Sequence, residues 1–278
     1  MNKEKINAQH QADLERIKGF RLMDDEFMSK VFDGDTKSTE LILRIIMDDD
    51  QIKVIDVVAQ YEIKNLQGRS ARLDIKAADK DGRIFDVEIQ RADKGAVAER
   101  ARFNSSIIDA NQLKRKQTYT DLKESYVIFF TENDVIGGNK PIYHVERVIQ
   151  EMGTLFNDGE HIIYVNGSYE DDTPLGQLVH DFNCTDAKDM YYKELAKRVR
   201  YFKETEKGIA AMCRSIEIMR NESEMQGAYN ARLEDLHRFV FEKKISSVDE
   251  AKKFYPSIKE EDIQEIFDSL HNMHSNQD

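Results

Sequence analysis

The sequence predicts an α/β protein with a mixed central sheet, followed by an α-helical C-terminal region. Two observations support this fold class. Between about residues 37 and 131 the expected elements run helix, strand, strand, strand, helix, strand, which is typical of a mixed α/β core. From Thr185 onward, apolar residues recur only at the three- and four-residue spacing of helices. We therefore expect two domains, a sheet-containing domain over residues 1–170 and a helical region over residues 171–278.

The composition is typical of a folded protein without membrane segments. The chain has 278 residues, of which 40% are hydrophobic and only three are prolines. Its apolar runs fall well short of the roughly 20 residues that a membrane helix needs, and its polar N-terminus lacks the apolar core of a signal peptide. The two cysteines, Cys184 and Cys213, form no CxxC pair and no disulfide framework. These features predict a cytoplasmic protein with no membrane partner.

The charge is acidic overall but unevenly distributed. A formal net charge of −12 disfavours non-specific attraction to nucleic acid. Residues 91–116 depart from this trend, with seven Lys or Arg residues and three acidic ones. This basic stretch is either a solvated helix face or a local surface for phosphate groups.

Three helices are expected before the first strand. They cover residues 1–20, the segment RLMDDEFMSKVFDGD from Arg21 with a stop at Gly34, and the segment TKSTELILRIIMDD from Thr36. Residues 51–68 are rich in β-branched side chains and predict one long or bent strand that ends at Gly68.

Further elements follow a hairpin at residues 71–90. We expect a helix over 95–116, a buried strand over 125–133, a short helix near 144–152 and a strand over 161–167. In the helical region, two capping boxes mark helix starts, Ser247 with Glu250 and Ser257 with Glu260.

The hairpin ARLDIKAADKDGRIFDVEIQ alternates strictly between apolar and polar residues. A two-residue turn at Asp81 and Gly82 would place the carboxylates of Asp74 and Glu88 on opposite faces. A three-residue loop over 80–82 instead puts Gly82 in the left-handed position and pairs Asp74 with Glu88. We expect the second register because it keeps every apolar residue on one side. The polar side then carries Arg72, Asp74, Lys76, Asp86, Glu88 and Gln90.

Paired in this way, Asp74 and Glu88 form a candidate metal site. Opposed residues have Cβ atoms roughly 5 Å apart, and like charges this close repel unless a cation lies between them. Oxygen ligands suit Mg²⁺ or Mn²⁺, which can polarise a phosphoryl oxygen and activate water. Gln90 projects from the same face and is able to hydrogen-bond such a water. The alternative is an ordinary solvated sheet face, with Asp86 and Lys76 in surface ion pairs.

Thirteen residues separate Asp74 from the tripeptide Glu88, Ile89 and Gln90. This spacing resembles the motif of the PD-(D/E)XK nuclease superfamily. The blocks DDEFMSKVF, TELILRII, ARLDIKAADKDGRIFDVEIQ, ERARFNSS and YVIFFTEND are similar, in this order, to the PD-(D/E)XK family transposases, which are related to recombination-promoting nucleases. The likeness runs from about residue 22 to 150 and more weakly to about 205. It implies a restriction-endonuclease-like αβββαβ core and metal-dependent hydrolysis of DNA phosphodiesters.

The resemblance assigns Asp74 and Glu88 as ligands of Mg²⁺ or Mn²⁺, with the backbone carbonyl of Ile89 as a third ligand. Asp74, Glu88 and Gln90 become the expected catalytic residues. Gln90 departs from the superfamily pattern, in which a lysine orients or activates the attacking water, because glutamine carries no charge. In the transposase-like branch glutamine is the usual residue, and Lys76 is a candidate substitute for the lysine.

Family members often add an acid from the first core helix. Glu40 fits that helix, whereas Asp24 or Asp25 fits the upstream D-x-x-F block, and the sequence leaves this choice open.

Arg100 and Arg102 match the family's R-x-x-Y/F neighbourhood, which implies phosphate contacts or braces for the carboxylates. Residues at i and i+2 cannot share one face of a helix, so at most one of them points into the site. The candidate DNA-binding residues are therefore Arg100, Arg102, Lys76 and Arg91, with surface ion pairs as the alternative.

Two functions remain open. The first is a divalent-metal-dependent DNA endonuclease, transposase-like and recombination-promoting, which acts on DNA and forms a homodimer through the helical C-terminal region. The second is a catalytically weak or inactive protein of nuclease fold that acts as a DNA-binding or protein-interaction module. Gln90 and the acidic net charge favour the second function, and the carboxylate pair with the following basic helix favours the first.

Overall fold

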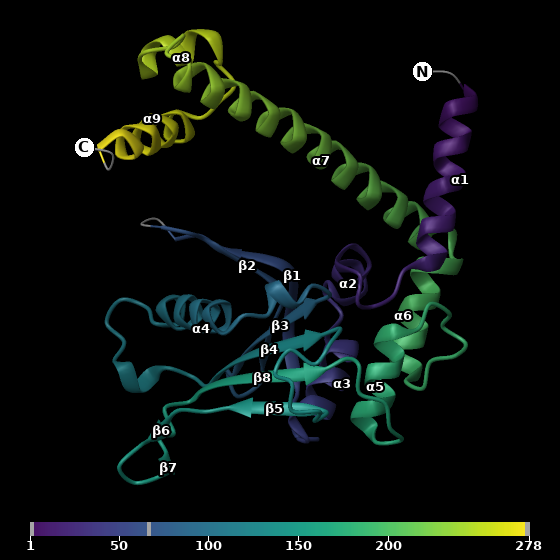
Figure 1. Ribbon diagram of the computed structural model, residues 1–278. Helices are drawn as coiled ribbons and strands as arrows, with labels where there is room; N and C mark the ends of the chain where they lie inside the picture. Colours follow the sequence, from purple (N-terminus) through teal and green to yellow (C-terminus); the bar gives the residue numbers. More distant parts are fainter. Residues whose placement is uncertain (1–2, 66–67, 276–278) are drawn as a thin grey trace. The chain divides into compact units, whose positions relative to one another are not determined.

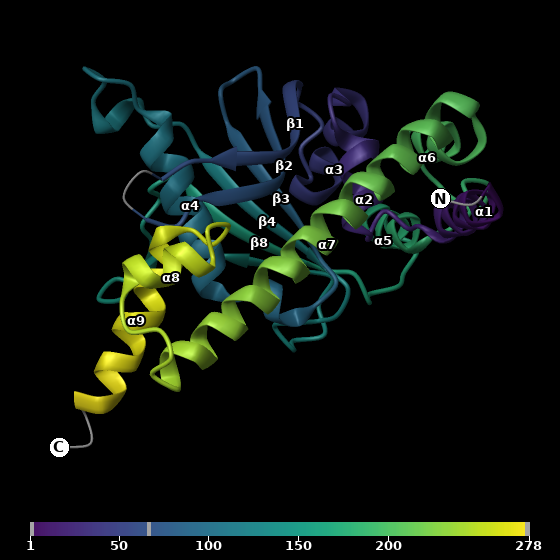
Figure 2. The same ribbon diagram turned by 90° about the horizontal axis from the view of Figure 1, so that it is seen from above.

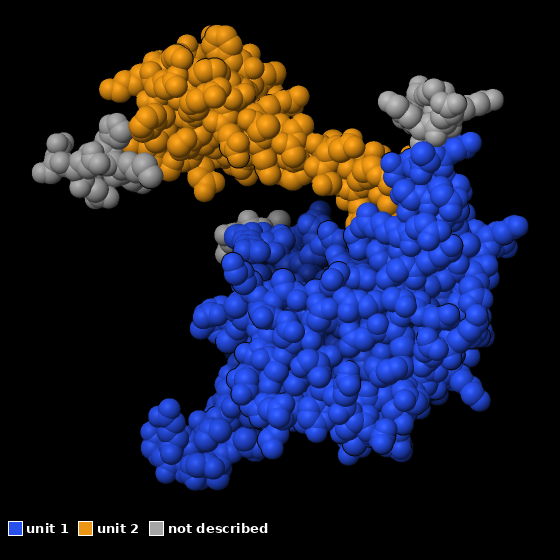
Figure 3. Space-filling model, turned by 45° about the vertical axis from the view of Figure 1, so that its right-hand side comes forward, with its two compact units in different colours: residues 1–213 blue, residues 214–278 orange. Residues whose placement is uncertain are grey.

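The computed structural model of the chain describes residues 3–65 and 68–275 (Figure 1). The chain divides into two compact units, residues 1–213 and residues 214–278, which Figure 3 distinguishes by colour. The first unit contains the central sheet, and the regular elements among the described residues of the second are helices.

Six strands form the central sheet of the first unit, in the order β1-β2-β3-β4-β8-β5. Strands β1 to β3 are antiparallel, β3, β4 and β8 are parallel, and β5 is an antiparallel edge strand. The mixed sheet and the order α3, β1, β2, β3, α4, β4 confirm the predicted fold class. The strands are β1 (Val54–Ile63), β2 (Ala71–Asp79), β3 (Ile84–Gln90), β4 (Ser125–Thr131), β5 (Ile142–Val145) and β8 (Glu160–Asn166).

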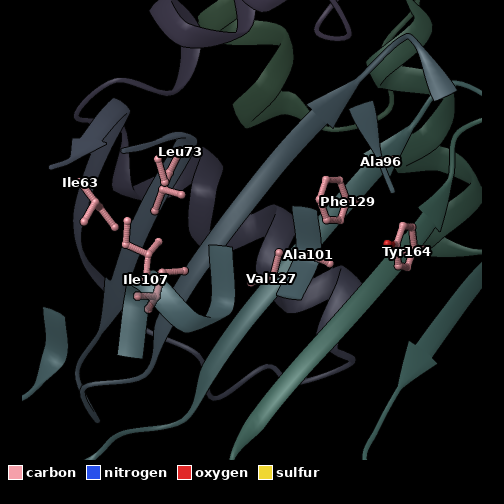
Figure 4. Close-up of a cluster of buried hydrophobic side chains, with 10 residues drawn as sticks. Ile63, Leu73, Ala96, Ala101, Ile107, Val127, Phe129 and Tyr164 are labelled. Atoms are coloured by element: carbon pink, nitrogen blue, oxygen red, sulfur yellow. The ribbon is translucent and has the colours of Figure 1, made fainter. Parts of the chain in front are cut away.

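Helices cover both faces of this sheet. Helix α4 lies on one face, and α3 and α5 lie on the other (Figures 1 and 2). On the α4 face, a cluster of buried residues includes Ala101 and Ile107 of α4 with Val127, Phe129 and Tyr164 of the sheet (Figure 4). The helices of this unit are α1 (Lys3–Gly19), α2 (Asp25–Phe32), α3 (Thr36–Met47), α4 (Ala98–Gln112), α5 (Pro174–Asn183) and α6 (Lys193–Glu204), with short 3₁₀ helices at Asp93–Gly95 and Tyr119–Asp121.

The first unit extends past residue 170, where the sequence placed the domain boundary, because α5 and α6 pack with the sheet-containing core. Phe182 of α5 stacks on Phe130 of β4, with ring centroids 4.2 Å apart. Leu195 and Val199 of α6 are buried, and α6 contacts α2 and α3. Helical periodicity identifies such helices but does not say which core they join.

The segment after β4 corrects one expectation. The short helix expected near residues 144–152 is absent from these described residues, which instead form β5 and the antiparallel pair β6 (Val148–Ile149) and β7 (Thr154–Leu155). Strand β5 adds to the sheet edge by pairing Tyr143 with Tyr164. Aromatic and β-branched residues at this edge gain more from the sheet ladder than from an isolated helical turn. The strand expected over 51–68 corresponds to β1, which ends at Ile63. Residues 66 and 67 of the expected strand lie outside the described residues.

The second unit has its own buried core. Helix α7 (Glu206–Phe241) runs into it, followed by α8 (Val248–Phe254) and α9 (Glu260–Ser275). The side chain of Ser247 accepts the N–H of Glu250 at 3.2 Å, which confirms the predicted N-cap of α8. The Glu250 side chain accepts the N–H of Ser246. The core residues are Leu236, Ile245, Ala251, Ile258 and Ile263. Over the described residues, no helix has the length and apolar character needed to cross a membrane.

Candidate active site

The β2–β3 hairpin turns through the predicted three-residue loop. Gly82 has φ +86° and donates its N–H to the carbonyl of Asp79 at 3.1 Å. Strand pairing joins Ile75 to Val87 and Lys76 to Asp86. The same register, continued by one residue, sets Asp74 opposite Glu88, as the alternation of the sequence predicted.

Asp74 and Glu88 converge on a common point. The side-chain nitrogen of Gln90 lies 3.4 Å from Asp74 Oδ2 and 3.3 Å from Glu88 Oε2. The amide of Gln90 therefore contacts both carboxylates. The two acids share a face and have one side chain as a common hydrogen-bond partner.

The three carboxylates on the polar side of the hairpin are buried, which corrects the alternative of a solvated sheet face. Asp86 and Glu88 are 0% exposed and Asp74 is 9% exposed. Asn104 of α4 donates to Asp86 Oδ2 at 2.9 Å and to Glu88 Oε1 at 3.1 Å. The expected surface pair of Asp86 with Lys76 is thus replaced by a buried contact with α4.

Lys76 points toward an aromatic ring. Its ammonium lies 4.3 Å from the centroid of the Tyr61 ring, a cation–π distance. Lys76 is not among the residues that line the cleft beside Asp74 and Arg100.

Burial and mutual repulsion raise the pKa values of the three carboxyl groups. Burial, followed by the negative charges of Glu88 and Asp25, raises the pKa of Asp74 to about 7. Burial also raises the pKa values of Asp86 and Glu88, and the charge of Asp86 adds to the shift of Glu88. Acids that repel one another in this way gain from a cation between them.

Arg100 is the arginine that reaches this site. Its guanidinium forms an ion pair with Glu88 and donates to the carbonyl of Gly95 at 3.1 Å. Arg102, two positions further along α4, is exposed. Asn104, which sequence reasoning missed, lies four residues after Arg100 and therefore on the same helix face.

The candidate additional acids occupy different places. Asp25 lines the same cleft as Asp74, and its Oδ1 accepts a hydrogen bond from Gln60 at 2.8 Å. Glu40 instead accepts the N–H of Val54 at 3.0 Å and pairs with Arg44. Asp25 is thus brought to the carboxylate pair, and Glu40 is not.

Arg91, a candidate for DNA binding, takes part in ion pairs that hold the fold. It lies 2.7 Å from Asp24 Oδ1 and 3.4 Å from Glu132 Oε2. Arg21 also pairs with Glu132 at 2.8 Å. Asp24 is therefore bound to Arg91 and does not join the carboxylates of the site.

A cleft of about 800 Å³ opens beside the carboxylates. Its lining includes three cations that sequence reasoning did not single out, Arg69, Arg72 and Lys94, together with Arg100. Arg69 precedes β2 and Arg72 lies at its start, whereas Lys94 lies in the 3₁₀ helix before α4, so no sequence spacing groups these cations. The same lining includes the acids Asp25, Asp74 and Glu99.

Gly95 makes room for the amide of Gln90. A Cβ atom at Gly95 would lie 1.9 Å from Gln90 Oε1. Any larger residue there must displace this amide, which sequence reasoning gave no reason to suspect.

The donor set fits a hard divalent cation, since it offers carboxylate oxygens from Asp74 and Glu88, with Asp25 nearby. The ligand oxygens of these three acids do not all lie within 4.8 Å of one another. Of the side chains in the described ranges, one group of three meets that spacing, and it consists of His180, Asp181 and Cys184. The carbonyl of Ile89 stays a predicted ligand, and its N–H donates to Asp74 at 2.9 Å.

Comparison with known families gives one match. A family model described as PD-(D/E)XK nuclease family transposase matches residues 35–240, which include Asp74, Glu88, Gln90 and Arg100. No curated protein and no solved structure matches the chain.

Proposed function

Because the chain belongs to the PD-(D/E)XK nuclease family transposases, we propose that it is a divalent-metal-dependent DNA endonuclease that promotes recombination. One observation carries this proposal. The side-chain nitrogen of Gln90 contacts both Asp74 and Glu88, beside a cleft whose cationic rim consists of Arg69, Arg72 and Lys94. DNA is the proposed partner, and its phosphates are the groups that this rim would bind.

Asp74 and Glu88 are the proposed ligands of Mg²⁺ or Mn²⁺, with the carbonyl of Ile89 as a third. Asp25 is a better candidate than Glu40 for an additional ligand, because it lines the cleft and its charge acts on Asp74. When bound, the ion would stabilise charge on the scissile phosphate and lower the pKa of an attacking water.

The neighbouring side chains would orient these groups. Asn104 holds Glu88 and Asp86 in place through its amide. Once Asp74 and Glu88 face an ion, the amide of Gln90 is free to donate to the water or to a phosphate oxygen. Arg100 supplies the permanent positive charge that Gln90 lacks, at a position beside Glu88.

The cationic rim would position the DNA backbone. Arg69, Arg72 and Lys94 line the cleft and are exposed, so they are free to meet phosphate oxygens. They replace Arg91 as candidate phosphate contacts, because Arg91 forms ion pairs with Asp24 and Glu132.

Cleavage of supercoiled plasmid tests the proposal. Nicking in Mg²⁺ or Mn²⁺ should fall at least 100-fold in Asp74→Asn and Glu88→Gln, whose side chains keep nearly the same size. Glu40→Gln is the matched control and should retain activity, whereas Asp25→Asn should lower it. Equal nicking by the wild type and both ligand variants would refute the assignment.

A second function is favoured by one observation. Gln90 donates to both acids, so a neutral amide stands where the superfamily lysine would act. A protein that binds DNA without cleaving it, and whose melting temperature does not rise with Mn²⁺, would be a DNA-binding or protein-interaction module. A cytoplasmic location and a homodimer through the helical C-terminal region remain part of the proposal, and light scattering tests the dimer.

A further inference from the structure

A second group of metal-ligating side chains lies at the end of α5, apart from the carboxylate site. His180 and Cys184 are four residues apart and therefore share one helix face. His180 Nδ1 lies 3.4 Å from Asp181 Oδ1 and 3.4 Å from Cys184 Sγ. The three ligand atoms all lie within 4.8 Å of one another.

These distances match the edges of a tetrahedral metal site. Zinc binds histidine nitrogen and carboxylate oxygen at about 2.0–2.2 Å and cysteine sulfur at about 2.3 Å. At the tetrahedral angle, such bonds place nitrogen and oxygen about 3.4 Å apart, and nitrogen and sulfur about 3.5 Å apart. Both 3.4 Å separations at His180 are close to these values.

The carboxylate is rigid, whereas the other two side chains are accessible. Asp181 is 0% exposed, and its two oxygens accept the N–H groups of Tyr191 and Tyr192 at 2.8 Å each. The His180 side chain is 45% exposed, and Cys184 is partly exposed. An ion therefore has an entry path to a ligand that the fold already holds in place.

The surroundings add negative charge at this place. The charges of Asp181, Asp186 and Asp189 act on the Cys184 thiol, opposed by the more weakly acting Lys203. Asp186 and Asp189 are exposed and do not belong to the group of ligand atoms within 4.8 Å of one another. Water is a possible fourth ligand.

We propose that His180, Asp181 and Cys184 bind a transition metal ion such as Zn²⁺. Mixed nitrogen, sulfur and oxygen ligands select such an ion, whereas the oxygen ligands of Asp74 and Glu88 select Mg²⁺ or Mn²⁺. Asp181 would then join the bound ion to the loop that carries Tyr191 and Tyr192, whose N–H groups its carboxylate accepts. This site does not depend on the proposed nuclease function.

Cobalt(II) added to the reduced 278-residue protein tests the proposal, because a cobalt–thiolate bond gives an intense near-ultraviolet charge-transfer band. We expect one equivalent of Co²⁺ to produce this band in the wild type and in Cys213→Ser, which removes the other cysteine. The band should disappear in Cys184→Ser and weaken at least tenfold in His180→Gln. Asp74→Asn should keep it, which separates this site from the carboxylate site.

Two results would overturn the proposal. One is the absence of the band in both the wild type and Cys213→Ser, and the other is its persistence in Cys184→Ser. Thiol alkylation of Cys213→Ser provides a second readout, and Zn²⁺ should slow modification of Cys184 at least tenfold. Circular dichroism verifies folding, and Asp181 is left unchanged because it caps two backbone N–H groups.

Discussion

At the scale of single residues, the main feature is a set of carboxyl groups held away from water. Asp74, Asp86 and Glu88 lie under α4, and their pKa values are raised above those of free side chains. Asp86 Oδ1 has no hydrogen-bond partner in the part of the chain that the structure describes. Without a cation, this arrangement lowers the stability of the folded protein near neutral pH.

The stability of the metal-free protein should therefore fall as the pH rises. Asp74 has a folded pKa of about 7, against about 3.9 when unfolded, so the folded state binds more protons between these values. The contribution of Asp74 to the free energy of unfolding is fully present below its unfolded pKa and is lost as the pH rises toward 7. Urea unfolding with a chelator should show a loss of about 2 kcal/mol or more between pH 5 and pH 8.

Mn²⁺ at pH 8 should restore this lost stability, because the ion binds the folded state alone. Asp74→Asn is the control, and it should show a shallower pH dependence and no response to Mn²⁺. Identical pH profiles for the two proteins would contradict the assignment of Asp74.

The contact between Gly95 and Gln90 leads to a second prediction at this scale. A methyl group at Gly95 would overlap Gln90 Oε1, and the flexible amide would move away from Asp74 and Glu88. Gly95→Ala should reduce plasmid nicking about tenfold, a loss of about 1.4 kcal/mol in transition-state stabilisation, with little change in melting temperature.

Gly19→Ala is the matched control for Gly95→Ala, since no atom lies within 4 Å of its added methyl group. It should leave nicking unchanged. Full activity of Gly95→Ala would mean that Gln90 does not need its present position.

At the scale of elements, the junction of α6 and α7 depends on a close backbone approach. A Cβ atom at Gly208 would lie 2.0 Å from the carbonyl oxygen of Tyr201 and 2.7 Å from the Cα of Phe202. These are backbone atoms, so no side chain is able to move aside.

Gly208→Ala should therefore destabilise the protein by about 1–3 kcal/mol in urea unfolding. Gly227→Ala, in the same helix, has no atom within 4 Å of the added methyl group and should stabilise the protein by about 0.5–1 kcal/mol. Equal changes in the two variants would disprove the close approach at Gly208.

The elements also differ in how well the sequence predicted them. The helix stop at Gly34 and the turn glycine Gly82 have positive φ values, as their positions suggested. The residues of β5 to β7 were instead expected to include a short helix. Strand β5 pairs with the edge of β8, which lies outside the segment itself, whereas β6 and β7 pair with each other.

At the scale of the whole molecule, the chain has two compact units with separate cores. Leu236 is fully buried in the core of residues 214–278. Leu236→Ala should cost about 2–5 kcal/mol in the stability of that core.

Hydrogen exchange measured by mass spectrometry would locate this effect. Protection should be lost in α8 and α9 and retained in β2, β3 and α4. Loss of protection in β3 in the same variant would mean that the two units unfold together. Ala251 is also buried in this core, and Ala251→Gly should weaken it by a smaller amount.

The sequence by itself determined the hairpin, its register and the shared face of Asp74 and Glu88, because alternation and a turn glycine act between residues close together in the chain. Only the tertiary structure decided that this face is buried, that Arg100 and Asn104 hold Glu88, and that Asp25 rather than Glu40 lies near Asp74. The same is true of Asp181, whose partners Tyr191 and Tyr192 lie beyond the end of its helix. The physical reason is that burial and long-range hydrogen bonds depend on how α2, α4 and α5 pack, and local periodicity does not encode that packing.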